Sequence, residues 1–289
     1  MELPDIRSRQ STHHGWRRVV SHIDLRGHQV WSVEKRPLFK RNPEKVLLLH
    51  GGLSSTESWI DAISPAVKGF HIYGYDRTAH GRTKIRDGYY HFDFQTDEAI
   101  AYLEDVVQGP AHLIGWSDGG IIALHVALKR PDLVSSIVLI GANYHHDCGA
   151  SHDVLTIEVK EEEKLLFAER SGQDPELLET IVRKAYEVWM SEPNLTVEDL
   201  NRINVPTLVL AGDDEPFTSE HTFSMYEALP LGRLAIVPGS SHFVVKEKRE
   251  LTQSIIKDFL ANLDYPITRW PNRRKEMTER LTQEDSANS

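Results

Sequence analysis

Short apolar runs alternate with longer amphipathic stretches along most of the chain, from Lys45 to Leu263. Several of the short runs are near-continuous blocks of apolar residues, which is typical of central strands covered on both faces. The predicted strands are 45–51, 70–76, 111–117, 136–143, 207–213 and 233–239, and the segments between them predict helices at 96–108, 119–130, 219–229 and 250–263. This alternation indicates a parallel sheet flanked by helices.

A stretch of alternating polar and apolar residues precedes these elements. Residues 18–36 alternate and turn at Arg26-Gly27, so we expect an antiparallel hairpin at the edge of the sheet. The predicted fold class is therefore α/β, with a mostly parallel central sheet and helices on both of its faces.

The regular alternation breaks at 145–204, which is helical in pattern and highly charged in places. We expect a small helical cap over the strand ends, where open α/β sheets bind ligands. An ordinary long helical crossover is the alternative. The expected organisation is a core at 1–144 and 205–265, the cap between them, and a charged C-terminal tail at 266–289. The tail is expected to be a loose helix followed by disorder.

Composition narrows the classes of partner. The 289 residues carry a formal net charge of −10, which argues against nucleic acid or an anionic membrane, because both require a basic face. The N-terminus lacks the apolar stretch of a secretory signal, and no apolar run reaches the ~18 residues of a membrane span. We expect a cytoplasmic protein with a small-molecule substrate; the pattern predicts no oligomeric state.

Neither a metal nor a cofactor is expected. The single cysteine, Cys148, excludes an internal disulfide and a cysteine-built metal site. Among the 15 histidines, His145 and His146 stand with Asp147 and His152 in one segment that could be arranged into a metal site. Adjacent histidines on an extended chain point in opposite directions, so we interpret them as solvated loop residues.

The candidate nucleophile is Ser117. It stands in Gly115-Trp116-Ser117-Asp118-Gly119, which follows the apolar run AHLIG and opens the helical segment GGIIALHVALKR. A serine on a sharp strand-to-helix turn has a strained backbone, and its neighbours two residues away on either side must lack a Cβ. Gly115 and Gly119 meet that requirement. The helix N-terminus would also favour developing negative charge at this point.

A serine nucleophile needs a base, and the base needs an orienting carboxylate. His242 follows the last predicted core strand, and three acids, Asp213, Asp214 and Glu215, end the strand before it. The order serine, acid, histidine matches a known order for this type of site.

The oxyanion formed during attack on a carbonyl also needs hydrogen-bond donors. The backbone N–H of Asp118 is the first expected donor. The second should come from the loop His50-Gly51-Gly52-Leu53, where Gly52 is the first choice and Leu53 the alternative. We expect His50 to brace this loop.

The chain resembles the α/β-hydrolase superfamily from about 17 to 264. The matching segments are 50–52, 75–83, 115–119, 212–216 and 241–242. The resemblance selects Glu215 as the acid, three places after the glycine that ends its strand, with Asp214 as the alternative because the family more often uses aspartate. It also implies structural roles for Arg77 and His80.

The elbow GWSDGGI and the strand end IGANY resemble the valacyclovir-hydrolase type of α-amino-acid esterase. That resemblance implies that Asp118 receives the substrate's ammonium group. The alternative is that an acid in the first turn of a helix is stabilised by the helix dipole alone.

The predicted function is serine-dependent hydrolysis of a carboxylic ester of a small substrate through an acyl-enzyme, with α-amino-acid esters as one substrate class. Cleavage of carbon–carbon bonds or lactones by the same triad is the alternative, as is a non-enzymatic receptor on this fold. Phe167, Tyr186 and Trp189 are candidate pocket residues of the cap, although aromatics at helical spacing also pack into cores.

Overall fold

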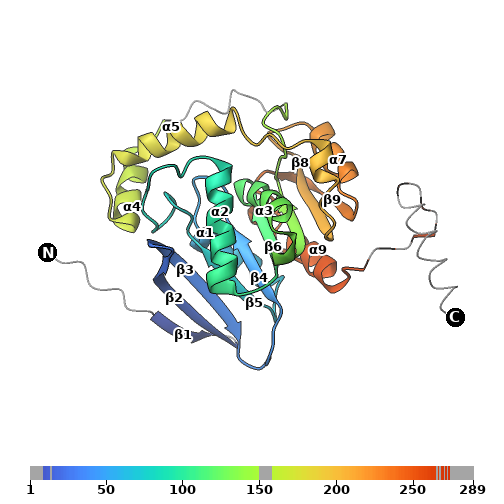
Figure 1. The fold of residues 1–289 in the computed structure, drawn as a ribbon, viewed down its shortest axis with the longest axis horizontal. Helices are drawn as coiled ribbons and strands as arrows, with labels where there is room; N and C mark the ends of the chain where they lie inside the picture. Colours follow the sequence, from blue (N-terminus) through green and yellow to red (C-terminus); the bar gives the residue numbers. More distant parts are fainter. Residues whose placement is uncertain are drawn as a thin grey trace.

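A nine-stranded sheet forms the centre of the described part of the chain (Figure 1). The computed structural model describes residues 9–13, 15–149 and 158–264 and the single positions 266, 268, 269, 271 and 273. In chain order the strands are β1 (Arg9–His13), β2 (Trp16–Leu25), β3 (His28–Pro37), β4 (Lys45–Leu49), β5 (His71–Tyr75), β6 (Ala111–Trp116), β7 (Val134–Ile140), β8 (Thr207–Asp214) and β9 (Gly232–Ser241).

The strands follow the spatial order β1-β2-β3-β5-β4-β6-β7-β8-β9. Neighbours from β5 to β9 are parallel, whereas β1, β2, β3 and β5 pair antiparallel. The predicted mostly parallel sheet is confirmed. The hairpin β2–β3 turns at Arg26 and Gly27, as expected, and both have positive φ. It lies one strand in from the edge, because β1 pairs with β2; β1 was not predicted.

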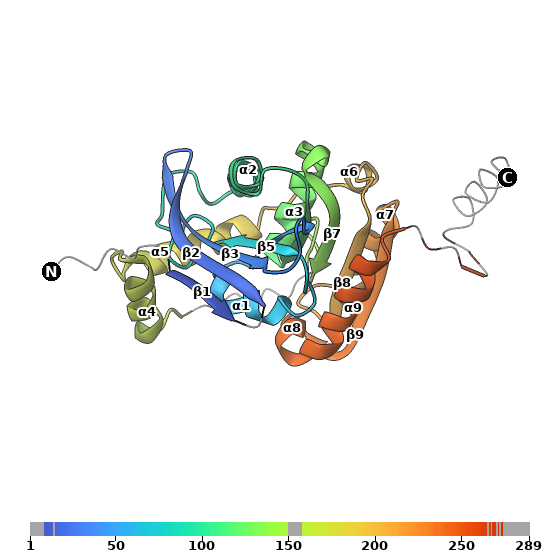
Figure 2. The ribbon, with the colours of Figure 1, turned by 90° about the horizontal axis from the view of Figure 1, so that it is seen from below.

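Helices cover both faces of the sheet. Figure 2 shows α2 and α3 on one side and α1, α8 and α9 on the other. Their bounds are α1 (Thr56–Ile63), α2 (Phe92–Tyr102) with a π-helical turn at Leu103–Val107, α3 (Asp118–Lys129), a 3-10 turn at Pro131–Leu133, α4 (Glu161–Ser171), α5 (Leu177–Trp189), α6 (Val197–Leu200), α7 (Ser219–Ala228), α8 (Val244–Glu247) and α9 (Arg249–Ala261). The predicted helices are present as α2, α3, α7 and α9; α1 was not predicted.

The central strands are apolar along their whole length because successive side chains enter different cores. In β4, Leu47 and Leu49 pack with α2 and α3, whereas Val46 and Leu48 pack with α1 and α9. A strand with one wet face would alternate apolar and polar residues instead. This two-sided burial anchors the strand ends from which the candidate site residues project.

The segment between β7 and β8 carries α4, α5 and α6. Ile181 of α5 packs with Ala79 and Tyr89, which lie in the loop after β5. Val188, near the end of α5, belongs to the core cluster of α2 and α3. Helix α5 therefore lies against the loops at the carboxyl ends of the parallel strands.

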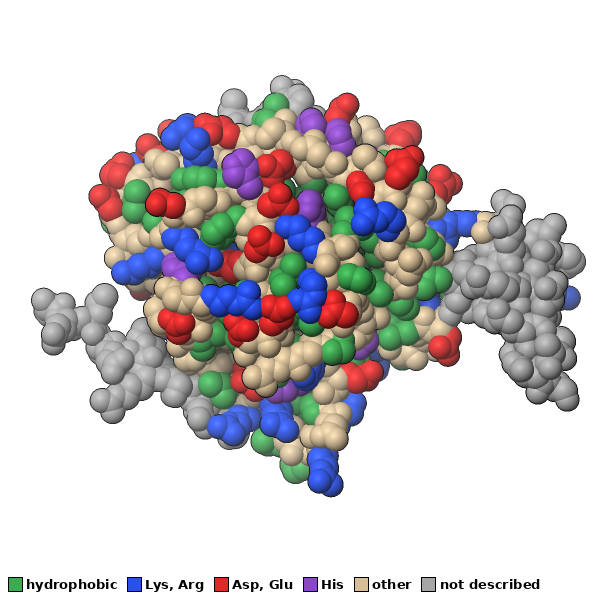
Figure 3. All heavy atoms as spheres, viewed as in Figure 1, with side chains coloured by type: hydrophobic (Ala, Val, Ile, Leu, Met, Phe, Trp, Pro, Cys, Tyr) green, Lys and Arg blue, Asp and Glu red, His purple; other side chains and the backbone are tan. Residues whose placement is uncertain are grey.

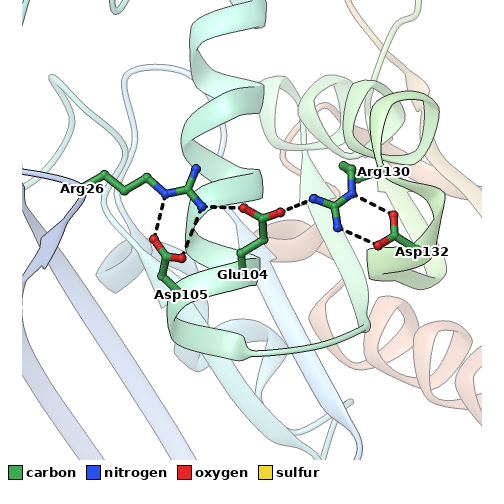
Figure 4. Close-up of polar contacts among 5 residues, drawn as sticks. All are labelled: Arg26, Glu104, Asp105, Arg130 and Asp132. Carbon is green, nitrogen blue, oxygen red and sulfur yellow. Dashed lines mark hydrogen bonds and ion pairs between the residues drawn. The ribbon is translucent and has the colours of Figure 1, made fainter.

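A surface ion-pair network ties the β2–β3 turn to the helical layer. Figure 3 shows a row of alternating basic and acidic side chains across the face in view. In the network drawn in Figure 4, Arg26 pairs with Asp105 at 2.8 Å and with Glu104, and Arg130 pairs with Glu104 and Asp132. These groups are substantially exposed, so we expect their contribution to stability to be small and sensitive to salt.

No helix among the described residues is long and apolar enough to cross a membrane. Most of the predicted tail, 266–289, lies outside the described residues. Of its described positions, Arg273 donates hydrogen bonds to the carbonyls of Tyr226 and Leu229, at the end of α7, at 2.7 and 2.5 Å.

Candidate active site

Ser117 stands at the turn from β6 into α3 with φ 53° and ψ −121°. A left-handed φ is costly for a residue with a Cβ and is a recurrent feature of functional turns. The flanking glycines make the turn possible. A Cβ on Gly115 would lie 2.2 Å from the backbone of Gly119, and a Cβ on Gly119 would lie 2.0 Å from the carbonyl oxygen of Leu49. Close backbone contacts at positions 115 and 119 thus leave no room for a Cβ, as the sequence predicted.

His242 and Glu215 lie together at the ends of β9 and β8. His242 Nδ1 is 2.7 Å from Glu215 Oε2, and the backbone N–H of Gly212 donates to Glu215 Oε1 at 3.0 Å. The Glu215 side chain is only 4% exposed. Because the carboxylate accepts from Nδ1–H, the neutral ring has Nε2 as its unprotonated nitrogen. Among the described residues, no hydrogen bond joins Ser117 to His242. Hydrogen bonds between catalytic groups are often long before the substrate binds.

The other two acids, Asp213 and Asp214, are the last residues of β8. Asp213 accepts the backbone N–H groups of Gly239 and Ser240 at 2.9 and 3.0 Å, which lowers its pKa. Asp214 is exposed. Of the three acids considered, Glu215 is the one that is hydrogen-bonded to His242.

Gly141, directly after β7, is a site residue that the sequence reasoning missed. It has φ 54°, and a Cβ here would lie 2.9 Å from His242 Nδ1 and 3.1 Å from Glu215 Oε1. On the other side, the Trp116 indole N–H donates to the carbonyl of His242 at 3.0 Å. The imidazole is therefore held between the strand after the elbow and the residue before Ser117.

The glycine loop after β4 lies on the other side of Ser117. A Cβ at position 52 would lie 2.6 Å from Asp118 Oδ2 and 2.4 Å from the Trp189 ring. Glycine is therefore the residue type that fits at this position without rearrangement. Leu53, the alternative donor, has φ 51° and is 37% exposed. The structure thus brings both candidate oxyanion residues, Gly52 and Asp118, next to each other.

His50 is fully buried beneath this loop. Its Nε2 accepts the backbone N–H of Arg77 at 3.1 Å, so Nδ1 must carry the proton and donate to the carbonyl of Gly51 at 2.8 Å. Burial, followed by the charge of Arg77, holds the pKa of His50 well below its ordinary value. A neutral imidazole therefore braces the loop.

Asp118 is 5% exposed and faces a buried cation. Arg77 Nη2 lies 3.9 Å from Asp118 Oδ2, and the Arg77 side chain is 0% exposed. Burial raises the pKa of Asp118, while the charge of Arg77 and a hydrogen bond from Trp189 oppose that rise. The carboxylate next to the nucleophile therefore has a permanent partner within the protein.

A small cavity of about 20 Å³, partly open to solvent, lies beside Asp118. Its walls combine α5 with the loops after β4 and β5 and with the first turns of α2 and α3. The lining residues are Leu53, His80, Tyr89, Tyr90, Gln95, Asp118, Ile181, Ala185, Val188 and Trp189. Of the three aromatic candidates from the cap, Trp189 lines the cavity. The Tyr186 ring packs edge-on against the Trp189 ring, with ring centroids 4.8 Å apart. Phe167 packs against the cluster of Ala79, Tyr89 and Ile181.

Within the described ranges, no group of three or more His, Cys, Asp or Glu residues has the arrangement of a metal site. The imidazoles of His145 and His146 stack at 4.5 Å, which corrects the expectation that they point apart: His145 forms an isolated bridge with Asn194, and the backbone bends at His146 and does not continue as an extended strand. His152 lies outside the described residues.

A strand-to-helix elbow that carries serine at the carboxyl edge of a mostly parallel sheet defines the class of α/β hydrolases. The family model for the alpha/beta hydrolase fold matches residues 45–191, and the chain belongs to that family.

Three similar proteins illustrate the range of the family. A human protein named serine hydrolase BPHL is 25% identical over 236 residues, covering 74% of this chain and 78% of its own. A bifunctional esterase/perhydrolase of Acinetobacter calcoaceticus is 28% identical over 259 residues, covering 76% and 92%. The structure of a meta-cleavage product hydrolase from Pseudomonas fluorescens IP01 has a TM-score of 0.66 at 19% identity, covering 84% and 97%.

Proposed function

We propose that this α/β hydrolase cleaves carboxylic esters of small molecules through a covalent acyl-enzyme on Ser117. The observation that carries the proposal is the 2.7 Å hydrogen bond between His242 Nδ1 and Glu215 Oε2. It leaves Nε2 free to take a proton, on a ring held beside the strained elbow. The esterase among the relatives supports the same reaction class.

The proposed reaction assigns one role to each of these groups. His242 Nε2 takes the Ser117 hydroxyl proton as Oγ bonds to the ester carbonyl carbon, and the carbonyl oxygen becomes an oxyanion. The backbone N–H groups of Asp118 and Gly52 stabilise that charge. The imidazolium returns the proton to the leaving alcohol as its C–O bond breaks. Water, activated in the same way, then hydrolyses the acyl-enzyme and restores Ser117. Glu215 orients the ring throughout and stabilises its charged form.

We further propose that residues 145–204 act as a cap whose helix α5 forms one wall of the acyl pocket. The cavity between α5 and the core is walled by Ile181, Val188 and Trp189 from the cap and by Tyr89 and Tyr90 from the core. Apolar walls of this kind favour an acyl group with an aromatic or aliphatic chain.

The role of Asp118 distinguishes esters with an uncharged acyl group from α-amino-acid esters as the substrate class. An α-amino-acid ester would need the carboxylate for its ammonium group, yet Arg77 already lies 3.9 Å from it. A second cation would compete with the guanidinium, so the geometry favours an uncharged acyl group. The opposite preference would support the α-amino-acid ester as the substrate class.

A matched substrate panel tests these proposals. The p-nitrophenyl esters of 3-phenylpropanoate and of phenylalanine differ only by the α-amino group, and the panel adds a γ-lactone and a vinylogous 1,5-diketone. We expect Ser117-dependent turnover of both esters, with higher kcat/KM for the phenylpropanoate. A preference for phenylalanine ester that is lost in Asp118→Asn would contradict the uncharged acyl assignment.

The remaining arms of the panel separate the other candidates. Carbon–carbon cleavage is included because a meta-cleavage product hydrolase shares the fold. Turnover of the diketone or the lactone alone would replace the ester proposal. Ligand binding without any turnover would indicate a receptor. The predicted cytoplasmic location stays a proposal that cell fractionation would test.

A further inference from the structure

The Arg77 side chain contacts backbone carbonyl groups of the glycine loop, residues 50–53. Nη2 donates to the carbonyl oxygens of His50 at 3.0 Å and Gly51 at 2.9 Å. On its other side, Nη1 donates to Gln95 Oε1 in α2. The guanidinium is fully buried, so these bonds form in a region that excludes water. Two consecutive peptide groups of the loop are thus held by one side chain.

The geometry of the peptide bond converts this contact into control of the oxyanion site. A trans peptide group is planar, and its C=O and N–H point in opposite directions. Holding the carbonyl of Gly51 toward Arg77 therefore turns the N–H of Gly52 away from Arg77. A glycine at position 52 has a wide choice of backbone angles, so the backbone alone does not enforce this orientation. Hydrogen bonds to the Gly51 carbonyl supply the constraint, and Arg77 donates one of them.

We propose that Arg77 is a positioning residue that keeps the Gly52 N–H in the orientation that stabilises the oxyanion, a role that rests on the ester-hydrolase function proposed above. His50 supports the same peptide through Nδ1–H, which also donates to the carbonyl of Gly51. Gln95 holds the guanidinium from the opposite side. The contact to Asp118 leaves that carboxylate neutralised beside the developing negative charge, but the carbonyl contacts set the orientation.

The test replaces Arg77 by lysine, which keeps the positive charge and removes the planar fork of donors. We expect kcat to fall roughly 10- to 100-fold with KM little changed, because loss of one oxyanion donor costs about 10²–10³ in kcat. The inhibition constant of a trifluoromethyl ketone, which forms an oxyanion on the serine, should rise in parallel with the loss in kcat/KM. Active-site titration with a fluorophosphonate normalises each rate to folded sites.

Arg86→Lys is the matched control. Arg86 lies 3.6 Å from the buried Glu98 and over the Phe94 ring. Within the part of the chain that the structure describes, it makes no hydrogen bond or ion pair with the glycine loop, so its variant should keep kcat and ketone affinity. If Arg77→Lys does not fold, Gln95→Met takes its place. It leaves the guanidinium but removes the acceptor that orients it, and we expect a several-fold loss in kcat with weaker ketone binding.

Three results would overturn the proposal: unchanged kcat in folded Arg77→Lys, an equal loss in Arg86→Lys, or a loss confined to KM with unaltered ketone affinity. If Gln95→Met has to replace Arg77→Lys, an unchanged kcat in Gln95→Met would also overturn the proposal. A wild-type protein without ester turnover would contradict the proposed function itself, which keeps the two failures distinguishable.

Discussion

The two sides of Ser117 each carry a buried carboxylate, but the carboxylates face different partners. On the base side, at the ends of β8 and β9, Glu215 is hydrogen-bonded to the imidazole of His242. On the oxyanion side, next to the loops after β4 and β5, Asp118 faces the guanidinium of Arg77. The imidazole exchanges a proton in the proposed reaction, whereas the guanidinium keeps its charge.

In the proposed reaction, the charge of the His242 imidazole changes during each turnover, whereas the charge of Arg77 stays the same. The imidazole must become cationic during each turnover, so its carboxylate has to respond to a change of charge. The oxyanion side must stay constant, because preorganised donors are effective only if they do not reorient. Variants on the base side should therefore change rate and pH profile, and variants on the oxyanion side should change transition-state affinity.

The largest expected effect comes from the base side. Glu215→Gln should lower kcat roughly 10²- to 10⁴-fold, because the amide cannot stabilise the imidazolium and can favour the wrong tautomer. Steady-state kinetics on the phenylpropanoate ester measure the change. Asp214→Asn is the control, since Asp214 is exposed and the acid hydrogen-bonded to His242 is Glu215. If the two variants lost activity equally, the assignment of Glu215 would be wrong.

A smaller effect is expected where the backbone approaches the pair. Gly141→Ala places a Cβ 2.9 Å from His242 Nδ1, so the imidazole must shift, and kcat should fall roughly 10- to 100-fold. Gly239→Ala imposes similar backbone strain at φ 65° but meets only the end of Lys248 at 3.7 Å. It should lose stability without losing kcat per active site. Equal kcat in the two variants would show that the ring position does not depend on residue 141.

The smallest effect concerns acid stability on the oxyanion side. Burial, and then the charge of Arg77, lowers the pKa of His80 from 6.5 to about 3. Between these values the unfolded chain binds this proton and the folded chain does not, so the free energy of unfolding falls as the pH falls. His50 contributes in the same direction.

Urea unfolding of His80→Gln from about pH 7 to pH 4.5 checks this expectation. The variant should lose less stability on acidification than wild type. His91→Gln, which removes an exposed histidine, is the control. An identical pH dependence in wild type and His80→Gln would contradict a neutral, half-buried imidazole at this position.

The sequence predicted the parts of this picture that depend on local pattern. Buried parallel strands appear as apolar runs, and the elbow needs glycines close to Ser117 in the chain. Glu215 was selected over Asp214 by family resemblance; in the structure Glu215 is hydrogen-bonded to His242 and Asp214 is exposed. Helix α1 is amphipathic, and it was missed because its eight residues are fewer than the window over which helical periodicity is read.

The remaining contacts depend on packing between distant segments, which a single sequence does not reveal. Arg77 meets the glycine loop 26 and 27 residues earlier in the chain. Gly141 is required to be small because of His242 and Glu215, which lie far along the sequence. In the pattern, both residues looked like ordinary parts of a turn and a strand end.

The most direct test of the central claim is covalent labelling of the folded protein with a fluorophosphonate. We predict one adduct per chain, located on Ser117 by peptide mapping, absent in Ser117→Ala and strongly slowed in Glu215→Gln. Folded wild-type protein that takes up no label, or takes it up equally in Ser117→Ala, would contradict an activated serine at this elbow.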